Sequence, residues 1–338
     1  MKTTTFGVDL AKRVFQIHWV DMETGEVGRQ QVKRDQLRTF FANRAPAVIA
    51  MEACGSAHYW ARQLASLGHE VRLISAHFVR PFVKRNKTDV ADAHAIWEAA
   101  QRPEMRFVAV KSESQQSVLT LHRVREQLVK VRTMQVNQIH GLLYEFGVAV
   151  PANRHSLREA EQALAQLADT LPAMVIDTLR EQLQRIGVLT KDIAEIERRL
   201  MVWQRENEAA KRLTAIPGVG LLSATAAVAT IGDPRMFRSG REFAAFLGLV
   251  PRQSGTGGRV KLLGISKRGD VYMRTLLIHG ARAVLARGKH LSEVLQRLLE
   301  RRPFNVAVVA LANKIARTIW ALLAHDRAYE PGDAARAA

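Results

Sequence analysis

The sequence lacks the features that mark a secreted or membrane-spanning protein. Its single cysteine, Cys54, excludes a disulfide bond within the chain and fits a reducing cytoplasm. No stretch combines cysteine and histidine at zinc-binding spacing, so any bound metal must be held by oxygen ligands. We find no signal peptide and no long uncharged apolar run. We therefore expect a cytoplasmic protein that does not enter a membrane.

Acidic residues are scarce relative to basic ones. The 338 residues include 50 lysines and arginines against 32 aspartates and glutamates, which gives a formal net charge of +18. A positive charge of this size points first to a polyanionic partner, most often nucleic acid, with an anionic membrane surface as the alternative. The 47% of hydrophobic residues is typical of a globular protein, and the length suits two or three domains.

The first hundred residues show the pattern of an α/β domain. Apolar residues at alternate positions predict strands, and apolar residues at spacings of three and four predict the helices between them. The predicted order is β-β-β-α-β-α-β-α, which is that of the ribonuclease H-like fold. The expected strands are 3–10, 14–20, 27–32, 47–51 and 71–74, and the expected helices are 35–44, 56–67, 76–84 and 89–100.

Two aspartates open the last of these helices. Asp89 and Asp92 are three residues apart, so they share one helix face, and Thr88 is the expected N-cap. A divalent metal between the carboxylates would explain the pair, since Mg²⁺ prefers carboxylate oxygens. The alternative is a solvated helix start that favours acids through the helix dipole. The pair follows a basic patch made of Arg80, Lys84, Arg85 and Lys87.

Two further acids lie at the ends of predicted strands. Asp9 is near the end of the first strand, and Glu52 directly follows the fourth. In a ribonuclease H-like fold the two central strands end side by side, with the last helix brought up to them. Four carboxylates from three elements at predicted element ends favour a metal site over a solvated surface.

The middle of the chain is helical. Ser112 and Gln115 form a capping-box pattern that begins a long helix reaching Phe146, whose basic side is either a solvated face or a nucleic-acid contact. Residues 155–211 are predicted to be a helical spacer. A coiled-coil seam, paired within the chain or with a second copy, is predicted from Leu179, Leu183, Ile186, Leu189, Ile193, Ile196, Leu200 and Trp203.

The last third contains a predicted helix-hairpin-helix-like turn and a glycine-rich loop. Residues 217–220 read Pro-Gly-Val-Gly between apolar helical runs, where backbone N–H groups could approach a phosphate. We expect residues 252–259 to be too rich in glycine for helix or strand, and to form either a flexible surface loop or a phosphate site. Helices are expected near 270–286, 291–300 and 304–324. The basic residues of this region, as candidates for nucleic-acid binding, are Arg252, Arg259, Lys261, Lys267, Arg268 and Arg274.

Several motifs stand in order over nearly the whole chain. They are Gly-Val-Asp-Leu-Ala-Lys (7–12), Met-Glu-Ala-Cys-Gly (51–55), Lys-Thr-Asp-Val-Ala-Asp-Ala (87–93), Ile-Pro-Gly-Val-Gly (216–220), Gly-Leu-Val-Pro-Arg-Gln-Ser-Gly (248–255) and Gly-Ile-Ser-Lys-Arg-Gly-Asp (264–270). The set resembles the DEDD transposases of the insertion-sequence 110 family, and its C-terminal part is similar to that family's 1111 subgroup. The resemblance implies a RuvC-like domain over 1–110, a helical linker over 111–211, a mainly α-helical transposase domain over 212–330 and a tail over 331–338.

The resemblance also implies the site residues. The acidic tetrad, which would hold Mg²⁺ as two ions, would be Asp9, Glu52, Asp89 and Asp92. The nucleophile would be a serine that forms a covalent link to DNA. We assign it to Ser254 because Gln-Ser-Gly is a variant found in the family. Thr256 stays open, because many relatives have two adjacent serines before the Gly-Gly.

The nucleic-acid partners follow from the same resemblance, whereas composition and the predicted fold permit two alternatives. Family members act on DNA with a structured RNA that pairs with donor and target DNA. We expect such a guide RNA here, with action at the bacterial nucleoid. Because no histidine base is evident near Ser254, activation by the metal site is expected, which requires the two domains to meet. If they meet between subunits, the protein is a homo-oligomer. The alternatives are a metal-dependent nuclease resembling Holliday-junction resolvases and a nucleic-acid-binding protein without catalysis.

Overall fold

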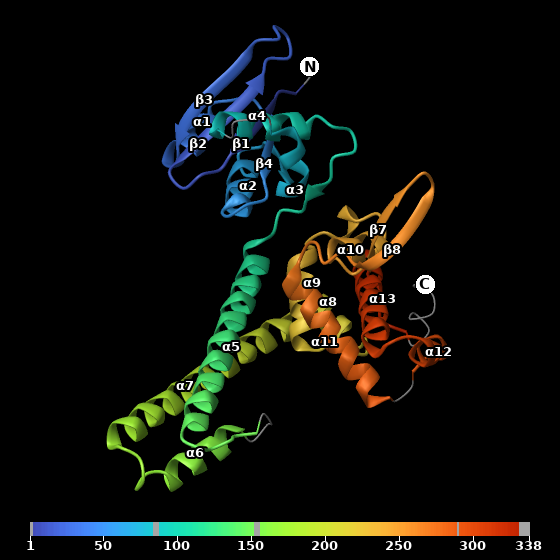
Figure 1. Ribbon diagram of the computed structural model, residues 1–338. Coiled ribbons are helices and arrows are strands. Elements are labelled where there is room, and N and C mark those ends of the chain that lie inside the picture. The colour runs from blue at the N-terminus through green and yellow to red at the C-terminus, as the bar shows by residue number, and fades with distance from the viewer. Residues whose placement is uncertain (1–2, 84–87, 152–155, 289–290, 331–338) are drawn as a thin grey trace. The chain divides into compact units, whose positions relative to one another are not determined.

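The computed structural model describes residues 3–83, 88–151, 156–288 and 291–330 (Figure 1). The chain divides into two compact units. The first contains the described residues up to Gln115 together with Ile231–Arg238, and the second contains Gln116–Thr230 with the described residues from Ser239 onward. The first unit is therefore built from two separate stretches of the chain.

A six-stranded mixed sheet forms the centre of the first unit, with the strand order β3-β2-β1-β4-β5-β6. The strands β1, β2 and β3 are antiparallel neighbours, β4 and β5 continue from β1 in parallel, and β6 is antiparallel to β5. The predicted strands are confirmed, and β6 is an addition. The strands are β1 (Thr5–Asp9), β2 (Val14–Val20), β3 (Val27–Lys33), β4 (Val48–Glu52), β5 (Glu70–Ile74) and β6 (Phe107–Val108).

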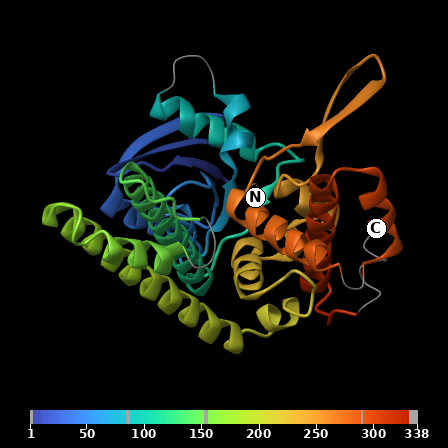
Figure 2. The same ribbon diagram turned by 60° about the horizontal axis from the view of Figure 1, so that its bottom comes forward.

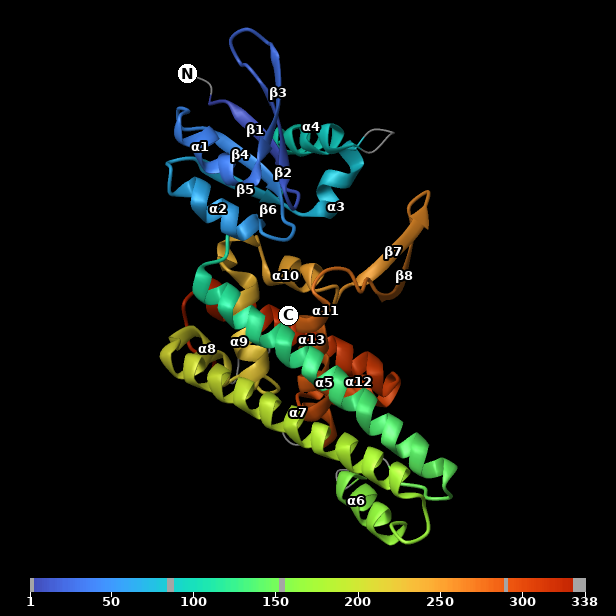
Figure 3. The same cartoon turned by 90° about the vertical axis from the view of Figure 1, so that its left-hand side faces the viewer.

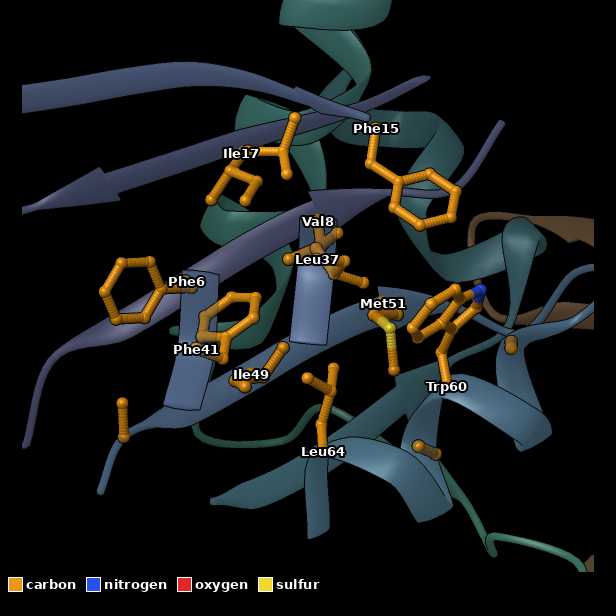
Figure 4. Close-up of a cluster of buried hydrophobic side chains, with 14 of the residues drawn as sticks. Phe6, Val8, Phe15, Ile17, Leu37, Phe41, Ile49, Met51, Trp60 and Leu64 are labelled. Carbon is orange, nitrogen blue, oxygen red and sulfur yellow. The ribbon is translucent and has the colours of Figure 1, made fainter. Parts of the chain in front are cut away.

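Helices cover both faces of this sheet (Figure 3). The helices α1 (Leu37–Ala42) and α2 (Ala57–Ala65) pack on one face over an aromatic-rich core that includes Phe6, Phe15 and Phe41 (Figure 4). On the other face lies α4 (Asp89–Ala100), whose small residues pack against Ala50 and Ile74. The segment between them contains α3 (Ala76–Val79) and the 3₁₀ turn Arg80–Phe82, where the sequence predicted one helix. The α/β character and the element order predicted for this part are confirmed.

The second unit is mostly helical. The long helix α5 (Glu113–Glu145) begins with the predicted capping box: Gln115 N donates to Ser112 Oγ over 3.2 Å, and Ser112 N donates to Gln115 Oε1 over 2.9 Å. The predicted helices near 270–286, 291–300 and 304–324 are also confirmed. The other helices of the unit are α6 (Ser156–Gln166), α7 (Ala173–Glu206), α8 (Glu208–Leu213), α9 (Leu221–Ile231), α10 (Gly240–Phe246), α11 (Val271–Arg287), α12 (Glu293–Arg301) and α13 (Phe304–Ala324).

The apolar seam of α7 packs within this chain. Its beginning, around Leu179, shares a core cluster with the end of α5 at Ile139 and Leu143. Its end, around Leu200, shares another with the beginning of α5 at Val118. The two helices therefore run antiparallel along each other, as Figures 1 and 3 show. Among the seam residues, Leu183, Leu189 and Trp203 are half-buried and the other five are buried.

The glycine-rich segment forms strands, so the prediction of an irregular loop was wrong. The strands β7 (Pro251–Thr256) and β8 (Arg259–Ile265) pair as an antiparallel hairpin. Its two-residue turn is Gly257-Gly258, with φ angles of +56° and +78°, values that favour glycine at both positions. The hairpin extends away from α10, α11 and α13 (Figure 2). The glycines that suggested a loop thus make the tight turn that joins two strands.

One helix of the second unit, α13, is long and apolar enough to cross a membrane by length and composition. About half of its most apolar stretch is buried inside the structure, and it contains Lys314 and Arg317. Its buried face includes Leu311, Ile315 and Ile319. A core helix with one buried apolar face passes the same test of length and composition, so this feature alone does not indicate a membrane span.

Candidate functional site

Three of the predicted acids lie together in the first unit. Asp9 ends β1, and Asp89 and Asp92 stand in the first turn of α4. Ligand oxygens of these three carboxylates lie within 4.8 Å of one another. Thr88 is the predicted N-cap, and its Oγ1 accepts a hydrogen bond from Ala91 N over 3.2 Å. The cap therefore holds the helix start that presents Asp89 and Asp92.

A glycine brings α4 close enough for this grouping. Gly7 lies on the sheet face covered by α4, and a Cβ at Gly7 would overlap the carbonyl oxygen of Ala93 and lie 2.6 Å from the backbone nitrogen of Trp97. Asp9 is two residues further along the strand, so its side chain leaves the sheet on the same face. The close approach of helix and strand thus places the acids of both elements at one end of the sheet.

The fourth predicted acid, Glu52, lies next to Asp9 in the sheet without joining the group of three. In the parallel ladder Val8 pairs with Met51, so Asp9 and Glu52 are the next residues on neighbouring strands. Burial raises the pKa of the Cys54 thiol, and the charges of Glu52 and Asp9 raise it further. The local field at this end of the sheet is therefore negative.

The donor set fits a hard cation. Asp89 is exposed and Asp9 and Asp92 are half-buried, so solvent and a ligand can reach the oxygens. No ion pair joins Asp89 or Asp92 to another described residue. Mutually close carboxylates repel one another unless a cation lies between them. Of the basic patch expected nearby, Arg80 lies in the 3₁₀ turn, whereas Lys84, Arg85 and Lys87 lie outside the described residues.

The hairpin of the second unit carries two hydroxyl side chains and two basic side chains on one face. Ser254 pairs with Lys261, and Thr256 pairs with Arg259, so these four side chains share one face. The alternate residues Val260 and Leu262 belong to the opposite face and are 65% and 62% exposed. Ser254 therefore stands on a basic face, directly across from a lysine.

The other candidate cations of this region divide into exposed and buried ones. Arg252, Lys267 and Arg268 are exposed. Arg274 is 7% exposed, and its guanidinium donates to the carbonyl oxygens of Leu247 and Arg268 over 2.8 and 3.0 Å. These bonds satisfy one carbonyl at the end of α10 and one in the loop before α11, which is a structural role. The burial of Arg274 argues against a direct phosphate contact.

The Pro-Gly-Val-Gly turn between α8 and α9 uses its first glycine for packing. Gly218 has φ +87°, and a Cβ there would lie 3.0 Å from the carbonyl oxygen of Gly280 on α11. A side chain on Gly280 would in turn overlap the carbonyl oxygen of Gly218. Gly220 has open space around it. Of the two glycines, only Gly220 leaves the backbone accessible in the way that a phosphate contact requires.

Comparison with known proteins places these motifs in one family. A family model described as "Transposase" of the DEDD, IS110 type matches residues 6–147, and a model described as "Transposase IS116/IS110/IS902 family" matches residues 210–296. The "Probable family 20 transposase" of Pseudomonas aeruginosa is 51% identical over 98% of this chain and 100% of its own length. The "Transposase for insertion sequence element IS1111A" of Coxiella burnetii is 43% identical over 96% of this chain and 91% of its own length. The "Transposase for insertion sequence element IS1328" of Yersinia enterocolitica is 42% identical over 94% of this chain and 96% of its own length.

The chain belongs to the insertion-sequence 110 family of transposases. A transposase cleaves and rejoins DNA, so this transposase is an enzyme and DNA is its substrate. Its first family match contains the three grouped acids, and its second contains Ser254 and the hairpin.

Sequence reasoning missed the hairpin of this transposase, and with it the shared face of Ser254 and Lys261. The signal was present in the sequence. A Gly-Gly pair between Gln253–Thr256 and Arg259–Leu262, where side chains alternate in character, is a recognised hairpin pattern. The buried histidines of the transposase were also missed, because only the fold shows that His18 and His122 are enclosed.

Proposed function

We propose that this transposase excises and inserts its own mobile element with two chemical groups. The first is an acidic tetrad of Asp9, Glu52, Asp89 and Asp92, set in a ribonuclease H-like, RuvC-like domain. The second is the hydroxyl of Ser254. The observation that carries the proposal is the gathering of three of these carboxylates within 4.8 Å at the end of the central strand. We further propose that the chain is organised as domains 1–110, 111–211 and 212–330.

The acids would hold Mg²⁺, as two ions. Carboxylate oxygens are the ligands Mg²⁺ prefers, and the exposed Asp89 leaves an open side from which DNA could enter. When bound there, Mg²⁺ would supply electrostatic stabilisation to a phosphate undergoing cleavage. The role of the protein is to present the oxygens through the end of β1 and the capped start of α4. Glu52, one residue beyond the pair Val8 and Met51, would complete the set.

Ser254 would attack the scissile phosphorus. A bond forms between its Oγ and phosphorus while the bond between phosphorus and a deoxyribose oxygen breaks, and the seryl proton finally resides on that departing oxygen. One phosphodiester replaces another, so neither an oxidant nor an external energy source is needed. Arg259 and Lys261 share the face of Ser254 and would bind the non-bridging oxygens, where negative charge gathers.

We also propose that an RNA encoded by the element guides the transposase and that it works as a homo-oligomer. The net charge of +18 suits backbone contact with nucleic acid. The exposed cations Arg252, Lys267 and Arg268 add to this surface.

The test is whether DNA stays covalently attached to the denatured transposase. Wild-type protein with its RNA, DNA ends and Mg²⁺ should give a protein–DNA adduct, Ser254→Ala none, and Thr256→Ala a reduced amount. Asp9→Asn or Asp89→Asn should abolish cleavage while leaving the fold intact.

A full adduct yield from Ser254→Ala with none from Thr256→Ala would reassign the nucleophile to Thr256. Free cleaved ends from both variants would favour attack by water, as in the resolvase alternative. Cleavage at the wild-type rate by either aspartate variant would remove the acidic cluster from the mechanism.

A further inference from the structure

The first unit also has a basic pocket, which is lined by none of the four acids of the proposed metal site. It is a pocket of about 820 Å³ beside the loop that follows β1. Its wall carries four cations and two aromatic rings, from Lys12, Arg13, Lys33, Arg34, Tyr59 and Trp60. A volume of this size is in the range of sites that hold small molecules or single nucleotides.

The fold brings these cations together from two segments. Lys12 and Arg13 lie in the loop between β1 and β2, whereas Lys33 ends β3 and Arg34 follows it. The register pairs Val14 with Lys33, and Arg34 N donates to the carbonyl oxygen of Arg13 over 2.9 Å. The pocket is therefore anchored by the sheet.

An aromatic wall closes the pocket on the side of α2. Trp60 is buried and packs edge-on against Phe15, with ring centroids 5.3 Å apart (Figure 4). The Arg34 guanidinium lies 5.4 Å from the centre of the Trp60 ring, which holds this cation in place. Tyr59 is 44% exposed, so part of its ring is available to a ligand. The indole Nε1 of Trp60 is buried and donates to no described atom.

The charges of the pocket are not neutralised. Asp35 is the one acid among its lining residues. No ion pair joins Lys12, Arg13 or Lys33 to another residue in the part of the chain that the structure describes. Cations alone would suit the backbone of a duplex, but an accessible tyrosine beside them adds a surface for stacking. Unpaired cations next to an exposed ring are the combination by which proteins bind single-stranded nucleic acid.

We propose that this pocket holds an unpaired nucleotide of a single strand, with the base on Tyr59 and the flanking phosphates on Lys12, Arg13 and Lys33. The proposal goes beyond the cleavage chemistry and depends on neither the acids nor Ser254. Single-stranded DNA and single-stranded RNA both offer a base and flanking phosphates, so the experiment compares a DNA oligonucleotide with an RNA oligonucleotide.

Binding of single-stranded oligonucleotides of about ten residues, each with one 2-aminopurine, tests this in nuclease-treated full-length protein without Mg²⁺. Stacking should quench the 2-aminopurine fluorescence. Tyr59→Leu should remove the quenching and weaken binding roughly fivefold to a hundredfold, whereas Tyr59→Phe should retain both. Lys12→Gln and Lys33→Gln should each lower the slope of log affinity against log salt by about 0.7.

The matched controls are Tyr144→Leu on α5 and Lys191→Gln on α7, both exposed, which should leave quenching and slope unchanged. If Tyr59→Leu loses more affinity for the RNA oligonucleotide, RNA is the ligand, and if it loses more affinity for the DNA oligonucleotide, DNA is the ligand. Equal losses of affinity for the two show that the pocket accepts both. The proposal is overturned if Tyr59→Leu binds single strands as the wild type does. It is also overturned if Tyr59→Leu loses as much affinity for duplex DNA as for single strands. Should Tyr59→Leu fail to fold, unchanged salt slopes for the two lysine variants overturn it.

Discussion

At the scale of single residues, the hydrogen bonds of the buried His122 determine which of its ring nitrogens carries the hydrogen. Thr225 donates its hydroxyl hydrogen to the Leu221 carbonyl, so it accepts from His122 Nε2 over 3.0 Å. His122 Nδ1 then accepts from the Tyr272 hydroxyl over 2.9 Å. Burial, and to a smaller extent the charge of Arg125, lowers the pKa of His122 to about 4. The neutral imidazole joins α5, α9 and α11.

This pKa predicts a loss of stability in mild acid. The folded pKa of His122 is below the ordinary value of 6.5, so the unfolded chain takes up a proton first as the pH falls from 6.5 to about 4. The free energy of unfolding should fall over this window by at most about 3 kcal/mol for this residue. In denaturant titrations from pH 7.5 to 4.5, His122→Gln should be less stable at pH 7.5 and show a flatter pH dependence. An unchanged slope would contradict the assignment.

Gly7 controls how close α4 lies to β1. In Gly7→Ala the added methyl group meets backbone atoms of α4 rather than a flexible side chain. We expect a loss of stability of about 1–3 kcal/mol and, because the start of α4 is displaced, loss of DNA cleavage. Thermal unfolding and a cleavage assay measure the two effects. Gly141→Ala, in a helix and with open space around it, is the control and should stabilise by up to about 1 kcal/mol.

At the scale of elements, the register of the β7–β8 hairpin predicts that the position of the Lys261 charge matters for the reaction at Ser254. Lys261 stands across from Ser254, and Leu262 points to the other face. Lys261→Ala should lower the rate of adduct formation by at least roughly tenfold, since it removes a cation from the charge that develops at phosphorus. Lys261→Arg should retain most of the rate.

The control keeps the net charge and changes its face. Lys261→Ala combined with Leu262→Lys carries the cation on the opposite face of the hairpin, so adduct formation should remain as slow as in Lys261→Ala. Recovery of the wild-type rate by this double variant would mean that only the overall charge of the hairpin matters. Quantifying the adduct over time on a denaturing gel separates the two outcomes.

Elements with local signals were predictable from the sequence. The caps at Thr88 and Ser112 were identified because a cap is decided by residues three apart. The hairpin was missed because glycine was interpreted as an irregular loop rather than as the turn of a strand pair. Arg274 was treated as a surface cation because its burial depends on Gly248 and on the end of α10, which sequence spacing does not show. The grouping of Asp9 with Asp89 and Asp92 was expected from the predicted element order, whereas the separation of Glu52 from that group depends on side-chain positions that the order does not show.

At the scale of the whole molecule, the positive charge is spread over many elements. The sequence shows no zinc finger and no basic-zipper region for reading base edges. We predict that the purified transposase carries an RNA encoded beside its own gene, because base pairing by that RNA would choose the site. Sequencing the co-purified nucleic acid checks this. Recombination should fail without the RNA and move to a new target when its pairing segment is changed, and site-specific recombination by RNA-free protein would disprove the guide.

The two-part construction of the first unit has a consequence for synthesis. Residues 116–230 are made before Ile231–Arg238 can join the sheet-containing unit, where Gly232 lies close to Ala109. At ordinary translation speeds the delay is roughly 10 s. During that time the strands and α4 have left the ribosome, but the unit still lacks its last segment. A nascent chain that stops before Ile231 therefore bears the acids on an unfinished unit. The first unit can be completed only after the helices of residues 116–230 have been synthesised.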